Sequence, residues 1–293
     1  MGPCHYATTV MRIEILGSGG AIPTPRAGCS CAVCVEARAK GVPYARTGPS
    51  VFVHDLALLI DTPEESNLQL NRAGITRVAA ALYSHWHPDH TAGRRIFETL
   101  NLDFRAWPRH PETTDVYLPQ QVARDFDTYL GLAAHLEFLQ ERQGTVRVHE
   151  LVDGDVLELD GTRIAPMRLA EDYVYAFLLE QDGVRVLVAM DELNGWRPPD
   201  LGALDVALLP LGIHEHHPFT GERRISEEHP VLRFEATYPE TLEVVRALDA
   251  RRVVLSHVEE MDGLSHDELV RLGKRDGWEP AYDGMVIEAG RRR

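Results

Sequence analysis

Short apolar runs separated by turn residues predict that strands make up much of this chain. Runs of this length that are rich in Val, Ile and Leu are typical of strands buried in a sheet. They fall at residues 11–16, 50–54, 57–61, 78–83, 116–119, 146–151, 156–159, 163–168, 173–180, 184–190, 205–212, 252–257 and 285–288. Asp-Gly pairs at 153–154, 160–161 and 182–183 mark turns. The runs from 146 to 190 are therefore expected to form a meander that makes up much of a second sheet.

Apolar residues at helical spacing predict helices between these strands. The expected helices lie at 64–72, 94–100, 240–248 and 265–272. A longer helical block, near 120–143, either covers the active site or is an extra helix packed on the sheets. No repeat, low-complexity run or linker divides the chain. Residues 1–293 are therefore interpreted as one α/β domain with a helical insertion.

Four residues that can bind metals follow the strand expected at 78–83. They are His85, His87, Asp89 and His90. Alternate residues at a strand end share a face, so His85 and His87 should point the same way, and a turn at Pro88 should bring Asp89 and His90 beside them. Imidazole and carboxylate ligands suit zinc, manganese or iron. A solvated, His-rich turn is the alternative, but it does not explain this density of ligand residues at a strand end.

The order His-x-His-x-Asp-His resembles the signature of the metallo-β-lactamase superfamily of hydrolases, and the resemblance runs from Arg12 to Glu288. It implies a four-layer αββα sandwich with a metal pair at one sheet edge, and a Gly-rich turn, here 17–20, near that site. It also implies that Asp191 bridges the two metals, that His257 is the last ligand and that Asp61 orients the ligands. Taken alone, Asp61 could equally cap the helix at 64–72.

A cysteine cluster marks one branch of this superfamily. Cys29, Cys31 and Cys34 stand on a loop bounded by Pro and Gly, and three such thiolates can converge on one zinc ion. Three unrelated buried thiols are the alternative. The loop resembles that of the cyclic phosphodiesterase of the phosphonate-degrading pathway, and is also similar to that of coenzyme PQQ synthesis protein B. The branch completes this site with a histidine where this chain has Glu260. Either Glu260 is the fourth ligand, or another group replaces it, or the zinc is lost.

Two further positions depart from the branch. Ala170 stands where the branch has a metal-binding histidine, so either Glu171 or Asp172 reaches the metal, or the first site keeps only His85 and His87. We therefore expect one or two catalytic ions, zinc or manganese, in addition to the structural zinc. The branch also uses a histidine near the leaving group, and Glu235 stands nearest to that place by count. Histidines of the preceding loop could compensate, and the best placed of them is His214; the others are His216, His217 and His229.

The resemblance and these residues predict a hydrolase of small, cyclic phosphodiesters that uses a metal-bound hydroxide. The candidate catalytic residues are Asp89, Asp191, His214 and Glu235. One alternative is an enzyme that opens lactones or esters, or one like PQQ synthesis protein B. The other is a metal-binding protein without catalysis.

Charge and composition narrow the partners. A net charge of -15 argues against a broad nucleic-acid-binding face, which leaves Arg223-Arg224 and 291–293 as short basic candidates. A small, anionic substrate is expected instead, and a homodimer is left open. No apolar run is long enough for a membrane helix. The first ten residues lack the features of a secretory signal, and four cysteines, including Cys4, suggest no disulfide framework. We therefore expect a cytoplasmic protein.

Overall fold

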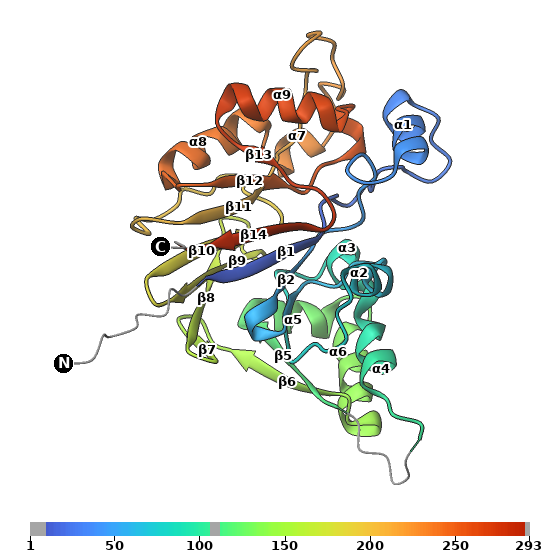
Figure 1. Ribbon diagram of the computed structural model, residues 1–293, viewed down its shortest axis with the longest axis vertical. Coiled ribbons are helices and arrows are strands. Elements are labelled where there is room, and N and C mark those ends of the chain that lie inside the picture. The colour runs from blue at the N-terminus through green and yellow to red at the C-terminus, as the bar shows by residue number, and fades with distance from the viewer. Residues whose placement is uncertain (1–9, 106–111, 291–293) are drawn as a thin grey trace, which may run out of the picture.

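The computed structural model describes residues 10–105 and 112–290. Two mixed sheets pack face to face, and helices cover their outer faces (Figure 1). The first sheet has the order β14-β1-β2-β3-β4-β5-β6 and the second the order β13-β12-β11-β10-β9-β8-β7. This arrangement confirms the predicted αββα sandwich. Cys4 and the basic run 291–293 lie outside the described residues.

The strands of the first sheet are β1 (Met11–Gly17), β2 (Ser50–Val53), β3 (Leu58–Ile60), β4 (Ala80–Leu82), β5 (Thr114–Pro119), β6 (Val146–Leu151) and β14 (Met285–Ala289). Those of the second are β7 (Leu157–Leu159), β8 (Thr162–Arg168), β9 (Tyr175–Gln181), β10 (Val184–Ala189), β11 (Val206–Pro210), β12 (Val253–Ser256) and β13 (Glu279–Pro280).

The α-helices are α1 (Ala32–Lys40), α2 (Ser66–Ala73), α3 (Pro88–Thr91), α4 (Ile96–Asn101), α5 (Gln120–Thr128), α6 (Leu132–Glu137), α7 (Val231–Phe234), α8 (Tyr238–Leu248) and α9 (His266–Asp276). Short turns of 3-10 helix are η1 (His54–Leu56), η2 (Ala92–Arg95) and η4 (Glu260–Asp262), and η3 (Phe138–Gln143) is a turn of π-helix.

The central strands of the second sheet, β9 to β12, are buried on both faces, which explains their almost continuous apolar sequences. Successive side chains of β10 point to opposite faces, as strand geometry requires. Val186 and Val188 enter the core between the sheets, whereas Leu187 and Ala189 enter the core beneath α8 and α9. Strands β10, β11 and β12 are parallel, so their carboxyl ends meet at one edge.

Two predictions about elements were wrong. Strand β6 does not belong to the meander, because it pairs in parallel with β5 at the edge of the first sheet. The block at 120–143 is not one helix: α5 ends before Tyr129, and Leu130 has a φ of 56°. Both residues are exposed, because the break turns their side chains away from the core.

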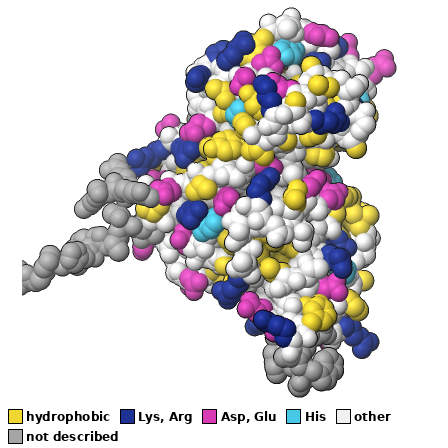
Figure 2. Space-filling model, turned by 45° about the vertical axis from the view of Figure 1, so that its right-hand side comes forward, with side chains coloured by type: hydrophobic (Ala, Val, Ile, Leu, Met, Phe, Trp, Pro, Cys, Tyr) yellow, Lys and Arg dark blue, Asp and Glu magenta, His cyan; other side chains and the backbone are white. Residues whose placement is uncertain are grey.

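Two further observations concern the surface and possible membrane spans. Acidic and basic side chains are interspersed on the face shown in Figure 2, without a continuous basic area among the residues coloured there. Within residues 10–105 and 112–290, no helix combines the length and apolar character needed to cross a bilayer.

Candidate metal centre and active site

The loop that follows β4 carries the motif and leads directly into α3. Pro88 occupies the first helical position, where its missing N–H costs nothing, and Asp89 lies in the first turn, where a carboxylate is favoured. The expected turn at Pro88 is therefore the first turn of a short helix. His85, before this helix, and His90, within it, are both fully buried.

Asp191 follows the end of β10 and lies between histidines from two other elements. Its Oδ2 is 3.1 Å from Nε2 of His85, and its Oδ1 is 3.3 Å from Nε2 of His257, which follows β12. Asp89 Oδ2 lies 3.2 Å from Nε2 of His90. These side chains form two overlapping groups, His85–His90–Asp191 and Asp89–His90–His257, each with its donor atoms within 4.8 Å of one another.

The donor atoms of this cluster fit a divalent cation. The Nε2 atoms of His85, His90 and His257 are buried and have no hydrogen-bond partner in the described part of the chain. Burial opposes ionisation of Asp89 and Asp191, yet the adjacent histidines hold both pKa values well below the ordinary range. The same carboxylates overcome burial and raise the pKa of His257 to about 10. The cluster therefore favours positive charge, and its nitrogen and oxygen atoms suit zinc or manganese.

Asp61 holds the ligand loop from behind. It is fully buried and accepts hydrogen bonds from the backbone N–H and the hydroxyl of Ser84, at 2.8 and 2.6 Å. It also lies 2.8 Å from Nδ1 of His90, which leaves Nε2 of that ring facing the cluster. The alternative that Asp61 caps α2 is wrong, because the residue at the N-cap is Glu65.

We expect Asp61→Asn to lower the affinity of the catalytic site for zinc by about 10- to 100-fold, because an amide does not hold the imidazole as a carboxylate does. Competition with a chromogenic chelator would measure this affinity. Asp55→Asn, an exposed substitution in the β2–β3 hairpin, is the matched control. Unchanged zinc affinity in Asp61→Asn would contradict this role.

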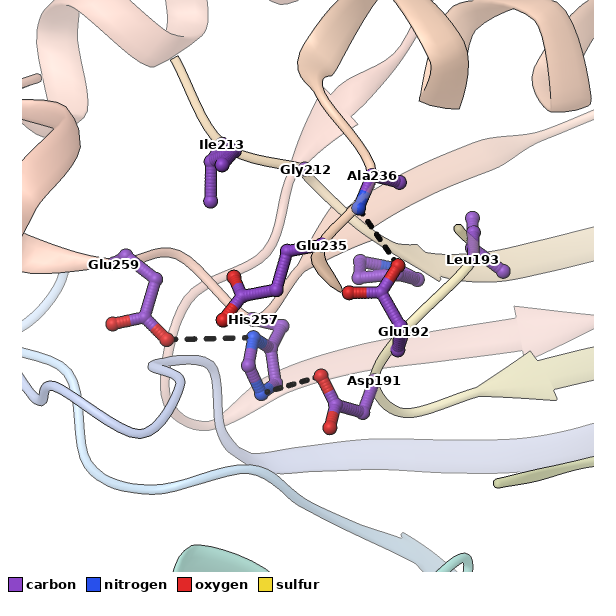
Figure 3. Close-up of a pocket in the computed structure, with 10 residues that line it drawn as sticks. Asp191, Glu192, Leu193, Gly212, Ile213, Glu235, Ala236, His257 and Glu259 are labelled. Carbon is purple, nitrogen blue, oxygen red and sulfur yellow. Dashed lines mark hydrogen bonds and ion pairs between the residues drawn. The ribbon is translucent and has the colours of Figure 1, made fainter. Parts of the chain in front are cut away.

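An acidic pocket adjoins the cluster. It is lined by Asp191, Glu192, Leu193, Pro210, Gly212, Ile213, Glu235, Ala236, His257 and Glu259. Figure 3 shows the carboxylates of Glu192, Glu235 and Glu259 directed into this region around His257. Burial and Asp191 raise the pKa of Glu192 to about 8 and that of Glu235 to about 7. Burial also raises the pKa of Glu259 to about 8, although His257 opposes this.

Two of these glutamates also hold backbone in place. Glu192 accepts a hydrogen bond from the N–H of Ala236 at 2.8 Å, which ties the segment carrying Glu235 to the end of β10. Glu259 accepts from the N–H groups of Ala21 and Ile22, each at 2.9 Å. The Gly-rich turn passes so close that a Cβ on Gly20 would lie 2.2 Å from Glu259 Oε1. Only glycine fits there.

The cysteine loop forms a separate group of potential ligands. The Sγ atoms of Cys29, Cys31 and Cys34 lie 3.2, 3.0 and 3.5 Å from Oε1 of Glu260. Cys31 is also the N-cap of α1 and accepts a hydrogen bond from the N–H of Cys34. Three thiols and one carboxylate around one point match the four-coordinate geometry of structural zinc.

Comparison with known proteins then gives the family. The family model of the beta-lactamase superfamily domain matches residues 49–258, which include the ligand loop, Asp191 and His257. The chain belongs to the beta-lactamase superfamily. This match confirms the superfamily that the motif predicted. The chain has the metallo-β-lactamase fold, which is shared by a family of hydrolases.

Several solved structures share the fold at low sequence identity. A diphosphatase from the PhnP family is 22% identical, with a TM-score of 0.70, and the match covers 94% of this chain and 97% of that one. Zn²⁺-bound PqqB from Methylobacterium extorquens is 17% identical, with a TM-score of 0.67, covering 94% and 99%. Human tRNase Z, short form, is 16% identical, with a TM-score of 0.60, covering 94% and 98%. A comparison with curated protein sequences gives no match.

Some predicted site residues belong to neither of the two groups of ligand atoms. His87 is in neither group of donors; its ring packs 4.5 Å from that of His85 and 4.6 Å from that of Trp86, and burial lowers its pKa to about 4. Glu171 is half-buried in a turn and is also in neither group. Ala170 is exposed.

His214 is buried, but it does not line the pocket. Its ring stacks on Tyr238 at 4.6 Å, and its Nδ1 lies 3.5 Å from Asp262. The chain turns at Gly212, which has a φ of 75°. A Cβ added at this position would lie 2.5 Å from Thr241 Oγ1. This turn places Ile213 at the pocket and His214 against Tyr238.

Three residues near the site were not predicted: Glu192, Glu259 and Tyr173. Glu192 directly follows Asp191, and Glu259 lies two residues after His257. Their closeness in sequence to predicted ligands could have indicated them. Tyr173 precedes the strand that follows Ala170, and its ring centroid lies 5.9 Å from that of His85 and 5.4 Å from that of His87.

Proposed function

We propose that this protein is a metal-dependent hydrolase of small phosphodiesters, cyclic ones included. The observation that carries the proposal is the convergence of three unpartnered imidazole nitrogens on Asp89 and Asp191, beside a pocket that contains Glu235. A phosphodiester has an electrophilic centre and a leaving oxygen, and this arrangement offers a cation site for the first and a carboxyl group for the second.

The residues that would hold one or two ions, zinc or manganese, are His85, Asp89, His90, Asp191 and His257. When bound, such an ion supplies a Lewis acid and lowers the pKa of water towards neutrality. Asp191 offers one oxygen towards His85 and the other towards His257, so its carboxylate can bridge two positions. Asp61 keeps His90 oriented.

Glu235 is the proposed general acid. It lines the pocket, and its pKa of about 7 means that a substantial fraction stays protonated at neutral pH. A protonated carboxyl can donate its proton to the departing oxygen. His214 remains a second candidate for this step, but its burial against Tyr238 favours Glu235.

One structural relative supports the substrate class. The similar PhnP-family enzyme is a diphosphatase, which supports hydrolysis at phosphorus over lactone opening. We further propose that the substrate is anionic and that Cys29, Cys31, Cys34 and Glu260 hold a structural zinc.

Purified protein loaded with zinc or manganese is expected to hydrolyse bis-p-nitrophenyl phosphate. His257→Ala should lower kcat/KM by at least about 100-fold, because it removes a ligand rather than one of its outer partners. His149→Ala, whose ring contacts Asp115 on the outer strands, should leave turnover unchanged. Mass spectrometry should find one or two metal ions besides one zinc. Zinc at the cysteine loop alone, with no turnover under any metal, would overturn the proposal.

A further inference from the structure

Tyr173 occupies a fixed position beside the cluster, in the turn between β8 and β9. The turn is closed by two backbone hydrogen bonds, from Leu169 N–H to Val174 at 2.9 Å and from Val174 N–H to Glu171 at 3.0 Å. The N–H of Tyr175 donates to the carbonyl of Ser84 at 3.0 Å, which fastens the turn to the residue before His85. The backbone therefore presents Tyr173 to the ligand loop.

The ring of Tyr173 packs beside two histidines of the ligand loop, with its centroid 5.9 Å from that of His85 and 5.4 Å from that of His87. Tyr173 is not among the residues that line the pocket, so its hydroxyl lies at the His85 and His87 side of the cluster. Within residues 10–105 and 112–290, it has no hydrogen-bond partner, although the ring is half-buried. A phenol with the ordinary pKa of about 10 is neutral at pH 7, so this hydroxyl can donate a hydrogen bond.

The site needs such a donor. The residues that line the pocket include no lysine or arginine, and most of their polar groups are carboxylates, which accept hydrogen bonds and repel an anion. The neutral hydroxyl of Tyr173 supplies a donor without adding negative charge to the site.

We propose that the hydroxyl of Tyr173 donates a hydrogen bond to a phosphoryl oxygen of the substrate, on the side of the site next to His85 and His87. Tyr173 thereby takes part in binding and catalysis, whereas the metal ligands are other residues. The inference rests on the proposed function, because it assumes a phosphoryl group at this cluster.

Tyr173→Phe keeps the ring and removes only the hydroxyl, so it separates packing from donation. The inorganic phosphate affinity of the zinc-loaded protein, measured by calorimetry, should fall about 10- to 100-fold, the usual effect of losing a hydrogen bond to a charged group. The kcat for bis-p-nitrophenyl phosphate should fall about 100-fold. The zinc content should stay that of the wild type. Tyr175→Phe removes a hydroxyl that contacts Arg168 and Asp153 instead, and should change none of these quantities.

Several outcomes would overturn the inference. The inference is wrong if wild type and Tyr173→Phe bind phosphate with equal affinity. It is also wrong if the zinc-loaded wild type binds no phosphate. Loss of zinc from Tyr173→Phe, or tyrosinate absorbance on zinc loading, would show a metal ligand instead. If the wild type hydrolyses the phosphodiester but Tyr173→Phe leaves phosphate affinity unchanged, only the role of Tyr173 is refuted. If Tyr173→Phe lowers phosphate affinity but the wild type hydrolyses no phosphodiester, the proposed function is refuted and the role of Tyr173 stands.

Discussion

Asp191→Asn is expected to remove catalytic metal from the cluster and to lower turnover by on the order of 10³-fold or more. Loss of an outer partner of a ligand already costs about 10- to 100-fold, and Asp191 contacts the cluster directly. Its two oxygens lie 3.1 and 3.3 Å from the unpartnered nitrogens of His85 and His257. An asparagine would present one oxygen and one NH₂ group, so one of the two histidines would face a donor instead of a carboxylate.

Metal content and turnover should be measured on the same preparation. Zinc at the cysteine loop should remain, so the total should fall only by the catalytic ions. Asp160→Asn is the matched control, because Asp160 is exposed, lies in a turn with a φ of 46°, and asparagine tolerates that conformation. An Asp191→Asn protein that keeps its catalytic metal and its activity would rule out a bridging role for Asp191.

The predictable part of this molecule is the part that depends on strand ends. His85, Asp191 and His257 each follow an apolar run, and their side chains converge on one cluster. The apolar runs placed these residues at strand ends, and the family resemblance marked Asp191 and His257 as ligands, so neither step needed the sheet order. The same reasoning correctly predicted two separate strands at β2 and β3, which pair as a hairpin.

Long-range pairing and tight turns were not predictable in the same way. Strand β6 and the meander have similar patterns, and an apolar run does not reveal which sheet it joins. His214 also follows a strand, but the left-handed turn at Gly212 directs it to Tyr238. The structural role of Glu192 depends on an N–H 44 positions away. Such contacts are determined by how distant segments meet, and no nearby residue signals them.

Glu260→Ala is expected to release one zinc ion and to lower Tm by on the order of 10 °C. Bound zinc at about 1,000 times its Kd stabilises the folded state by about 4 kcal/mol. For chains of about 150–250 residues, 1 kcal/mol corresponds to about 2–4 °C in Tm. The expected loss follows from geometry, because Glu260 supplies the oxygen nearest to all three thiols. It also anchors the loop 29–34 to η4, more than 200 positions away.

Glu260→His is the matched control for this experiment. The related branch has histidine at this position, and imidazole with three thiolates is an established zinc set. Glu260→His should therefore keep the zinc and most of the Tm, while Glu260→Ala should lose both. Atomic emission gives the zinc content, and differential scanning calorimetry with and without a chelator gives the Tm. If the wild type carries no zinc here, or if the chelator leaves its Tm unchanged, the carboxylate serves only as a hydrogen-bond acceptor for the thiols and as the ion-pair partner of Arg26.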